Sequence, residues 1–474
     1  MNRRLLFSLA TALAVGACND QQEPNSGNST PGAELASTTN TIGVNVLLKA
    51  AATAANRTEL ARYGTLLDEI AELKAIRMRM AANQLPSVRK LQFVAAATPD
   101  AQRNAIPVDA VAVTDFAGGV NTWDQDAINA TDLGTTARQV AYDGSGVYVA
   151  ILDTGLLPTW RQYFPEERIA SGLAKAFGGG GQDNDNVSEP PNKWEDDADS
   201  HGTHVTSTIL GFQMPTRIVN GTAPKATVIP VKVLNQNGSG WSSAIARGIV
   251  YVTELKRTTL AGSPIVINMS LGGSELDALE QAAIDQAVAA GIIVVASAGN
   301  NGEAGMGYPG AYQPVISAAA SGWIGEWTPC AGPTTGSNWW RLCDVPDPTD
   351  ASNFYITDFS AREKPGQDLD VAAPGSWVVG PYQTNQSNAV SFFFLGGTSM
   401  ASPHVAGIVA LMKQKNPNLT AAEAESTLES SAIPLPAGSR NIVDPNIGPT
   451  TVSWGDDASG AGLVTADAAL KKTK

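Results

Sequence analysis

The sequence predicts a three-layer α/β domain with a mostly parallel central sheet, preceded by a smaller α+β unit. Four short apolar runs in the C-terminal part do not alternate with polar residues, which is typical of strands buried on both faces of a parallel sheet. Stretches with helical spacing separate these runs, as the crossover connections of such a sheet require. The 474 residues also include 46 glycines and 28 prolines, which indicate many turns.

The large domain is expected to cover residues 117–474, without an internal repeat. Its strands are predicted at residues 147–152, 228–233, 265–269 and 292–296, and its helices at residues 203–210, 242–255, 276–290 and 401–415. One segment, residues 320–359, has neither helical nor strand periodicity, and it holds four of the ten tryptophans. We expect it to be a loop insertion packed by its own aromatic side chains.

The smaller unit is expected at residues 41–116. Its predicted elements are a strand at 44–48, a helix at 58–67, a strand at 73–80, a short helix at 85–91 and a strand at 93–97. Residues 19–40, which precede it, are rich in Asn, Gln, Ser, Thr, Pro and Gly. That composition predicts a flexible tether.

The first 18 residues have the pattern of a signal peptide. Arg3 and Arg4 precede an apolar run at residues 5–15, which is too short to span a membrane as a helix. Residues 15–18 resemble a bacterial lipobox, in which Cys18 would become the lipidated N-terminus. Ordinary cleavage before Cys18 is the alternative. Both interpretations predict a secreted or extracytoplasmic protein, and only a lipid on Cys18 would hold it at a membrane before maturation.

The other two cysteines, Cys330 and Cys343, lie in the segment 320–359. In an oxidising compartment we expect them to form a disulfide with each other. Their spacing alone does not establish this pairing.

Charge is unevenly distributed along the chain. Residues 117–474 carry 20 Lys and Arg against 35 Asp and Glu, whereas residues 1–116 carry 11 against 10. A large domain this acidic argues against nucleic acid or an anionic membrane surface as a partner.

Three motifs hold residues suited to nucleophilic catalysis. Residues 149–155 place Asp153 at the carboxyl end of a buried strand, where ligand crevices form in α/β sheets. His201 opens one helix, and Ser399 opens another among unpaired N–H groups. Pro403 is expected in the first turn of that second helix, because it has no N–H to donate. In this set His201 would take the proton of Ser399, and Asp153 would fix the histidine tautomer.

These motifs, in the order Asp, His, Ser, resemble those of the subtilisin-like serine peptidase family. The resemblance covers residues 44–474 and implies the subtilisin-like fold and a serine endopeptidase that hydrolyses protein or peptide substrates through an acyl-enzyme. It also implies that residues 41–116 are an inhibitory prodomain, a partner of the enzyme that is removed by self-cleavage near Phe116–Ala117. Other cuts within residues 101–117 are the alternative. No cofactor is required for this chemistry.

The resemblance assigns an oxyanion donor and a substrate-binding surface. Asn300 would donate its amide to the oxyanion beside the N–H of Ser399, although an Asn in this sequence also favours a turn. Small residues are expected to pair with an extended peptide and to form a roomy, neutral pocket for the residue before the cut. The pairing residues are Gly238, Ser239, Gly240, Ser270, Leu271 and Gly272, and the pocket residues are Ser297, Ala298, Gly299 and Gly307.

Two parts of the sequence hold side chains that are common metal ligands. His201 and His204 lie one helical turn apart, but the Glu that such a metal site uses is missing, so His204 and His404 are expected to be packing residues. Structural calcium is common in the family, and an acidic stretch offers oxygen ligands for it, although a solvated acidic loop is the alternative. The stretch comprises residues 183–186, Glu189, Asp196, Asp197 and Asp199.

Two other classes of function are the alternatives to a peptidase. A pseudoenzyme that binds a partner through the Trp-rich segment would not need the complete set of Asp153, His201, Ser399 and Asn300. An esterase would use the same covalent chemistry but not the segments that pair with an extended peptide.

Overall fold

The computed structural model describes residues 40–105, 107–112, 122–131, 138–178, 189, 193–214, 217–327, 345, 350–383 and 391–474. Several expectations lie outside these residues. They are the signal peptide with Cys18, the tether up to Thr39, the bond Phe116–Ala117, residues 183–186, and the pair Cys330 and Cys343.

The N-terminal unit is a four-stranded antiparallel sheet in the order β2-β3-β1-β4, with two short helices. Its elements are β1 (Thr41–Leu48), α1 (Ala54–Leu60), β2 (Gly64–Ile70), β3 (Ala75–Ala81), α2 (Leu85–Val88) and β4 (Val94–Pro99). The expected helix at 58–67 is wrong beyond Leu60, where α1 ends, and β2 begins at Gly64. Gly64 pairs with Met80 of β3, so sheet pairing overrides the local helical pattern there.

The main sheet has the order β16-β15-β14-β13-β7-β11-β8, and β17 pairs with β15. Its strands are β7 (Tyr148–Asp153), β8 (Lys175–Ala176), β11 (Thr227–Lys232), β13 (Ile265–Met269), β14 (Ile293–Ser297), β15 (Ile316–Trp323), β16 (Phe354–Ile356) and β17 (Val371–Pro374). All pair in parallel except the edge strand β16. The predicted mostly parallel sheet is confirmed.

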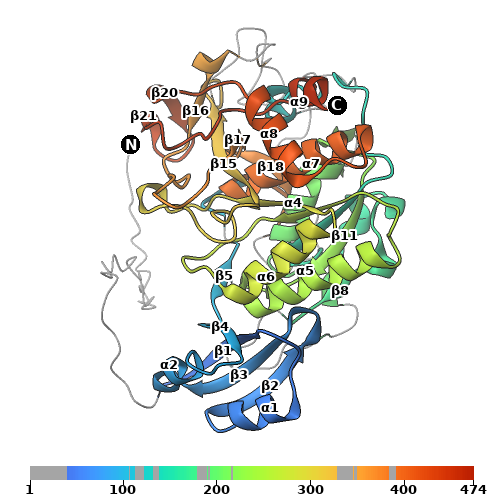
Figure 1. The fold of residues 1–474 in the computed structure, drawn as a ribbon. Coiled ribbons are helices and arrows are strands. Elements are labelled where there is room, and N and C mark those ends of the chain that lie inside the picture. Colours follow the sequence, from blue (N-terminus) through green and yellow to red (C-terminus); the bar gives the residue numbers. More distant parts are fainter. Residues whose placement is uncertain are drawn as a thin grey trace, which may run out of the picture. The chain divides into compact units, whose positions relative to one another are not determined.

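Helices cover both faces of this sheet (Figure 1). They include α3 (Trp123–Ala127), α4 (His201–Leu210), α5 (Ser242–Arg257), α6 (Ala278–Ala289), α7 (Thr398–Lys415), α8 (Ala421–Ser431) and α9 (Ala466–Lys472). In β7, Val149 and Ile151 belong to the core that contains α4 and α7, whereas Ala150 and Leu152 belong to the core that contains α5 and α6. Both faces of the strand are therefore apolar, which explains why its sequence does not alternate.

The segment 320–359 is not irregular at its ends, contrary to expectation. β15 runs to Trp323, which pairs with Phe354 of the returning strand β16. Trp327 packs its ring against Trp377 and Phe394, at centroid distances of 5.7 and 5.1 Å. The described ends of this segment are thus an antiparallel extension of the main sheet, and Trp327 contacts aromatic residues from elsewhere in the domain.

Several shorter strands form small sheets outside the main sheet, and some of them contribute to the site. β5 (Gln102–Asn104) pairs with β12 (Ser239–Trp241), and β6 (Asp109–Ala112) pairs with β19 (Phe392–Gly396), which also pairs with β18 (Val378–Pro381). Two hairpins form two-stranded sheets of their own: β9 (Gly211–Met214) with β10 (Arg217–Asn220), and β20 (Gly438–Asp444) with β21 (Gly448–Trp454). Within the described ranges, no helix is both long and apolar enough to cross a lipid bilayer.

Candidate active site

Asp153, His201 and Ser399 come together at the carboxyl edge of the main sheet. Asp153 ends β7, His201 is the first residue of α4, and Ser399 is the second residue of α7. The Nδ1 atom of His201 lies 2.9 and 3.0 Å from the two carboxylate oxygens of Asp153. All three side chains are buried. This contact fixes the ring, so Nε2 is the nitrogen left for a proton transfer.

Ser399 is held close to His201's helix but is not yet bonded to the ring. Its Oγ donates to the carbonyl of Ser270 at 3.2 Å. The Nε2 atom of His201 has no hydrogen-bond partner among the described residues. Loose contacts of this kind are common before a substrate is engaged.

The surroundings of His201 favour its protonated form. Burial alone would lower the pKa of the imidazole, but the charge and hydrogen bond of Asp153 outweigh burial and raise the pKa above its ordinary value. Behind them, the buried Asp197 accepts the N–H of Ser200 at 2.7 Å and the hydroxyl of Thr203 at 3.0 Å. Asp197 thereby anchors the turn that leads into α4.

Asn300 and the start of α7 form one hydrogen-bonded unit. The Oδ1 atom of Asn300 accepts the N–H of Thr398 at 2.9 Å and the hydroxyl of Thr398 at 2.8 Å. The amide oxygen is thus occupied, which leaves the Nδ2 group as a donor beside Ser399. The N–H of Ser399 lies in the first turn of α7, where backbone donors have no helical partner.

Pro403 lies inside α7 rather than in its first turn, so that expectation is wrong. A residue with an N–H at this position would donate to the carbonyl of Ser399, four residues earlier. That carbonyl instead accepts the hydroxyl of Ser270, at 2.8 Å. The helix tolerates the proline because a side chain from the neighbouring strand end replaces the missing donor.

A cavity of about 330 Å³ opens beside Ser399. Its described lining carries no charged side chain and includes the predicted residues Gly272, Ser297, Gly299, Asn300 and Gly307 together with Ser399. Ala298 is buried in the core behind them. The cavity is neutral and lies where the sequence analysis expects the pocket for the residue before the cut.

A segment of the chain itself lies in the groove that leads to Ser399. We call residues 102–105 and 107–112 the linker. Asn104 and Gly272 exchange two backbone hydrogen bonds of 3.0 Å, and the N–H of Ala105 donates to the carbonyl of Gly238 at 2.8 Å. On the other side, the N–H of Val108 donates to the carbonyl of Gly396 at 2.8 Å. Of the predicted peptide-pairing residues, the linker thus contacts Gly238, Ser239, Gly240 and Gly272.

The N-terminal unit also binds the ends of two helices of the large domain. Asp100 accepts the N–H of Ser243 at 3.0 Å and its hydroxyl at 2.6 Å, and so caps α5. Arg103 of the linker donates to both carboxylate oxygens of Glu280 in α6, and both side chains are buried. Sequence reasoning did not find these contacts, because each joins residues more than 140 positions apart.

The other histidines have packing roles, as the sequence analysis proposed. The Nε2 atom of His204 lies 3.1 Å from the carbonyl oxygen of Val378, and burial lowers the pKa of His204 to about 3. His404 lies between the carbonyl of Met400 and the carboxylate of Asp124, at 2.8 and 2.9 Å.

The described members of the acidic stretch do not gather around one point. Glu189 pairs with Lys175 and Asp196 with Lys193, at 2.7 and 2.6 Å. Asp197 is occupied by Ser200 and Thr203, as above. Among the described residues, the group of acidic side chains with metal-like spacing lies elsewhere.

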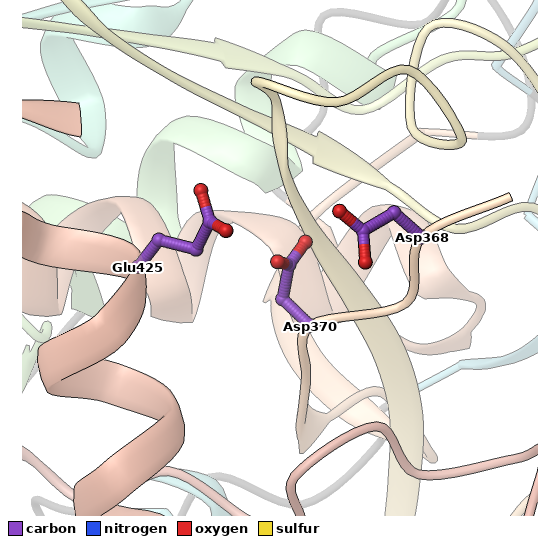
Figure 2. A group of neighbouring side chains, drawn as sticks. All are labelled: Asp368, Asp370 and Glu425. Atoms are coloured by element: carbon purple, nitrogen blue, oxygen red, sulfur yellow. The ribbon is translucent and has the colours of Figure 1, made fainter. Parts of the chain in front are cut away.

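That group is Asp368, Asp370 and Glu425, with one oxygen of each within 4.8 Å of the others. Figure 2 shows the carboxylate of Asp370 between those of Asp368 and Glu425 of α8. Asp370 is 1% exposed, and its Oδ2 accepts the N–H and hydroxyl of Ser317, both at 2.7 Å. Its Oδ1 has no partner among the described residues, and burial raises its pKa to about 7. Sequence reasoning does not find this group, because Glu425 lies far along the chain from the other two residues.

Comparison with known proteins identifies the family of this chain. The model of the subtilase family matches residues 144–462, which include all three motifs. The chain belongs to the subtilase family. Subtilisin DY of Bacillus licheniformis is 34% identical over 298 residues, which cover 62% of this chain and 86% of that protein. Thermitase of Thermoactinomyces vulgaris is 31% identical over 290 residues, or 61% of this subtilase and 82% of thermitase.

Solved structures agree on the fold of this subtilase. Fervidolysin of Fervidobacterium pennivorans, described as a keratinolytic enzyme related to subtilisin, aligns with a TM-score of 0.63 at 22% identity. The alignment covers 91% of this subtilase but only 61% of fervidolysin. Sphericase aligns with a TM-score of 0.51 at 25% identity, over 74% of this subtilase and 99% of sphericase. Family membership and the relatives at 31–34% identity support a serine peptidase of the subtilisin type.

Proposed function

We propose that this subtilase is a secreted serine endopeptidase that is made as an inactive precursor and processes itself. The single observation that carries the proposal is the linker, which pairs as an extended strand with Gly272 and Gly238 next to Ser399. Backbone pairing of this kind reads the main chain of a peptide and is independent of most side chains. It favours a peptidase over an esterase, whose substrates lack such a backbone.

The reaction follows from the atoms of the site. The Nε2 atom of His201 takes the proton of Ser399 as Oγ attacks the substrate carbonyl carbon, and Asp153 stabilises the imidazolium that forms. The Nδ2 group of Asn300 and the N–H of Ser399 donate to the oxyanion. His201 then protonates the leaving amine, and water hydrolyses the acyl-enzyme by the same steps.

The N-terminal unit is proposed to act as an inhibitory prodomain. Its linker fills both sides of the groove, and the buried pair of Arg103 with Glu280 holds it there. An external substrate would have to displace these contacts. Cleavage within residues 101–117 therefore has to precede activity. The sequence predicts a cut near Phe116–Ala117, whereas the pairing of Asn104 with Gly272 favours a cut closer to the linker's contacts with the groove. Lipidation of Cys18 would tether the precursor to a membrane until that cut.

Structural calcium is proposed at Asp368, Asp370 and Glu425. Three carboxylates supply the hard oxygen donors that calcium prefers, and the buried Oδ1 of Asp370 lacks another partner in the described chain. This group would stabilise the contact between α8 and the segment before β17. None of the steps above requires it.

Casein cleavage tests the central proposal. The matured wild-type protein should digest denatured casein, and the Ser399→Ala protein should not. Loss of cleavage in the variant separates this function from a pseudoenzyme, for which neither protein would act. Cleavage of an ester but not of casein by the wild type would favour the esterase.

A further inference from the structure

Asp199 presents a carboxylate at the edge of the groove without a cationic partner. It is half-buried and lies two residues before His201. Its Oδ1 accepts the N–H of His201 at 3.3 Å, a long hydrogen bond. In the described parts of the chain, no Lys or Arg forms an ion pair with it. A half-buried carboxylate without a counter-charge is costly, so its surroundings would favour a cation.

The carboxylate adjoins the place in the groove that Ala105 occupies. Gly238, with φ of +68°, accepts the N–H of Ala105 through its carbonyl. A Cβ added to Gly238 would lie 2.9 Å from the carbonyl oxygen of Ala105 and 3.3 Å from the Oδ2 atom of Asp199. Asp199 and Ala105 therefore flank the same small space beside Gly238.

The pairing register identifies which substrate residue occupies this place. Asn104 pairs with Gly272 in antiparallel fashion, so a bound peptide that continues this register places its second following residue opposite Ser270. The carbonyl of Ser270 is the group that Ser399 Oγ contacts. The bond after that residue then meets Ser399. Ala105 thus marks the position of the second residue before the cut.

We propose that Asp199 selects substrates with Lys or Arg as the second residue before the cut. The inference rests on the proposed peptidase function and specifies its substrate class. Both side chains carry their charge at the end of a flexible stem, which can cross the small space beside Gly238 to reach the carboxylate. An ion pair between this substrate side chain and Asp199 would offset the free-energy cost of desolvation that burial already imposes on the carboxylate.

Two further observations agree with this selection. Burial raises the pKa of Asp199 to about 6. The nearby charge of His201 lowers this pKa, and those of Asp197 and Asp153 raise it. The carboxylate is therefore charged at neutral pH. Ala105 itself is small and neutral and makes no use of the charge. A linker tethered to the same chain does not need the extra contact, because its effective concentration is already high.

The test uses the matured enzyme and peptide pairs that differ only in Lys or Met as the second residue before the cut, verified by mass spectrometry. We expect kcat/KM for the Lys peptide to exceed that for the Met peptide by ~10-fold or more, with a smaller ratio at high salt. Asp199→Asn should bring the ratio close to one, and Asp199→Glu should retain part of it. The matched control is Asp196→Asn, an exposed neighbour paired with Lys193, which should keep the wild-type ratio.

A wild-type ratio near one, or an unchanged ratio in Asp199→Asn, would overturn the inference while leaving the peptidase function intact. Failure of the matured enzyme to cleave either peptide would overturn the proposed function and this inference with it. Because the readout is a ratio, a general loss of rate in Asp199→Asn does not affect the comparison.

Discussion

Asn104 and Gly272 exchange two backbone hydrogen bonds of 3.0 Å, although 168 positions separate them in the chain. One residue belongs to the linker and the other to the wall of the cavity beside Ser399. The groove is thus occupied by the chain's own backbone in the manner of a substrate. The first prediction follows from this occupancy.

Replacing Ser399 with Ala should give a folded protein that keeps its N-terminal unit attached. The hydroxyl is the attacking group, and its loss removes only the 3.2 Å bond to the Ser270 carbonyl. Intact mass and N-terminal sequencing would measure the product, with Ser430→Ala on the exposed face of α8 as control. Normal maturation of the purified Ser399→Ala protein would show that another protease makes the cut.

Asn300→Ala should lower kcat by ~10²-fold or more, the size known for this type of donor in subtilisin, with little change in KM. The amide acts on the charge that develops in the transition state, while its Oδ1 only supports Thr398. Steady-state kinetics on one peptide would separate the two constants. An effect confined to KM would assign Asn300 to ground-state binding.

The rate should rise with pH through an apparent pKa above 6.5. His201 must be neutral to accept the proton of Ser399, and Asp153 raises its pKa, so protonation blocks the reaction at a higher pH than for a free imidazole. Burial of His201 lowers its pKa, so removal of the linker, which reduces this burial, would raise the pKa further. The expected direction is therefore the same for the mature enzyme. A profile of kcat/KM against pH checks the sign, and an apparent pKa below 6.5 would contradict it.

Breaking the pair of Arg103 with Glu280 should loosen the N-terminal unit. Removing one partner of a buried ion pair leaves an uncompensated charge and costs ~3–5 kcal/mol. Thermal unfolding of Arg103→Ala in the Ser399→Ala background should show a lower Tm for the first transition. Arg57→Ala is the matched control, because its pair with Glu69 is exposed and contributes ~1 kcal/mol or less. Equal shifts in the two variants would mean that the buried pair does not hold the linker.

Chelation of calcium should lower the Tm of the mature enzyme if Asp368, Asp370 and Glu425 hold the ion. Asp370→Asn should remove this dependence, because it replaces the central carboxylate while keeping its shape. Asp467→Asn, in the first turn of α9, serves as control and should retain it. A wild-type Tm that is insensitive to both calcium and chelator would show that the group binds no calcium.

The sequence allowed the main sheet and the three motifs to be predicted because their signals are local. Strands buried on both faces have apolar runs, and Asp153 follows such a run directly. The helix at 58–67 failed because β2 forms only through pairing with β3, which a local pattern does not contain. The same reason hid β16, whose partner Trp323 precedes it by a long segment.

The sequence predicts which residues form the site, but not the contacts that hold them in place. Neither the contact of Ser270 with the carbonyl of Ser399 nor the position of Pro403 inside α7 follows from the motif alone. Both depend on how a strand end meets a helix. Asp199 was assigned to an acidic stretch because its neighbours in sequence are acidic, whereas its neighbour in space is Gly238.

The linker lies on both sides of the groove as part of one polypeptide, and this has a kinetic consequence. Before the cut, blocking is unimolecular, so dilution of the precursor leaves it unchanged. After the cut, the N-terminal unit becomes a separate molecule whose rebinding depends on its concentration. The same contacts would then inhibit the enzyme in a confined cell envelope, where the concentration of the cleaved unit is high. In a large external volume that concentration is low, and the unit would dissociate. The switch from one regime to the other requires no change in the groove.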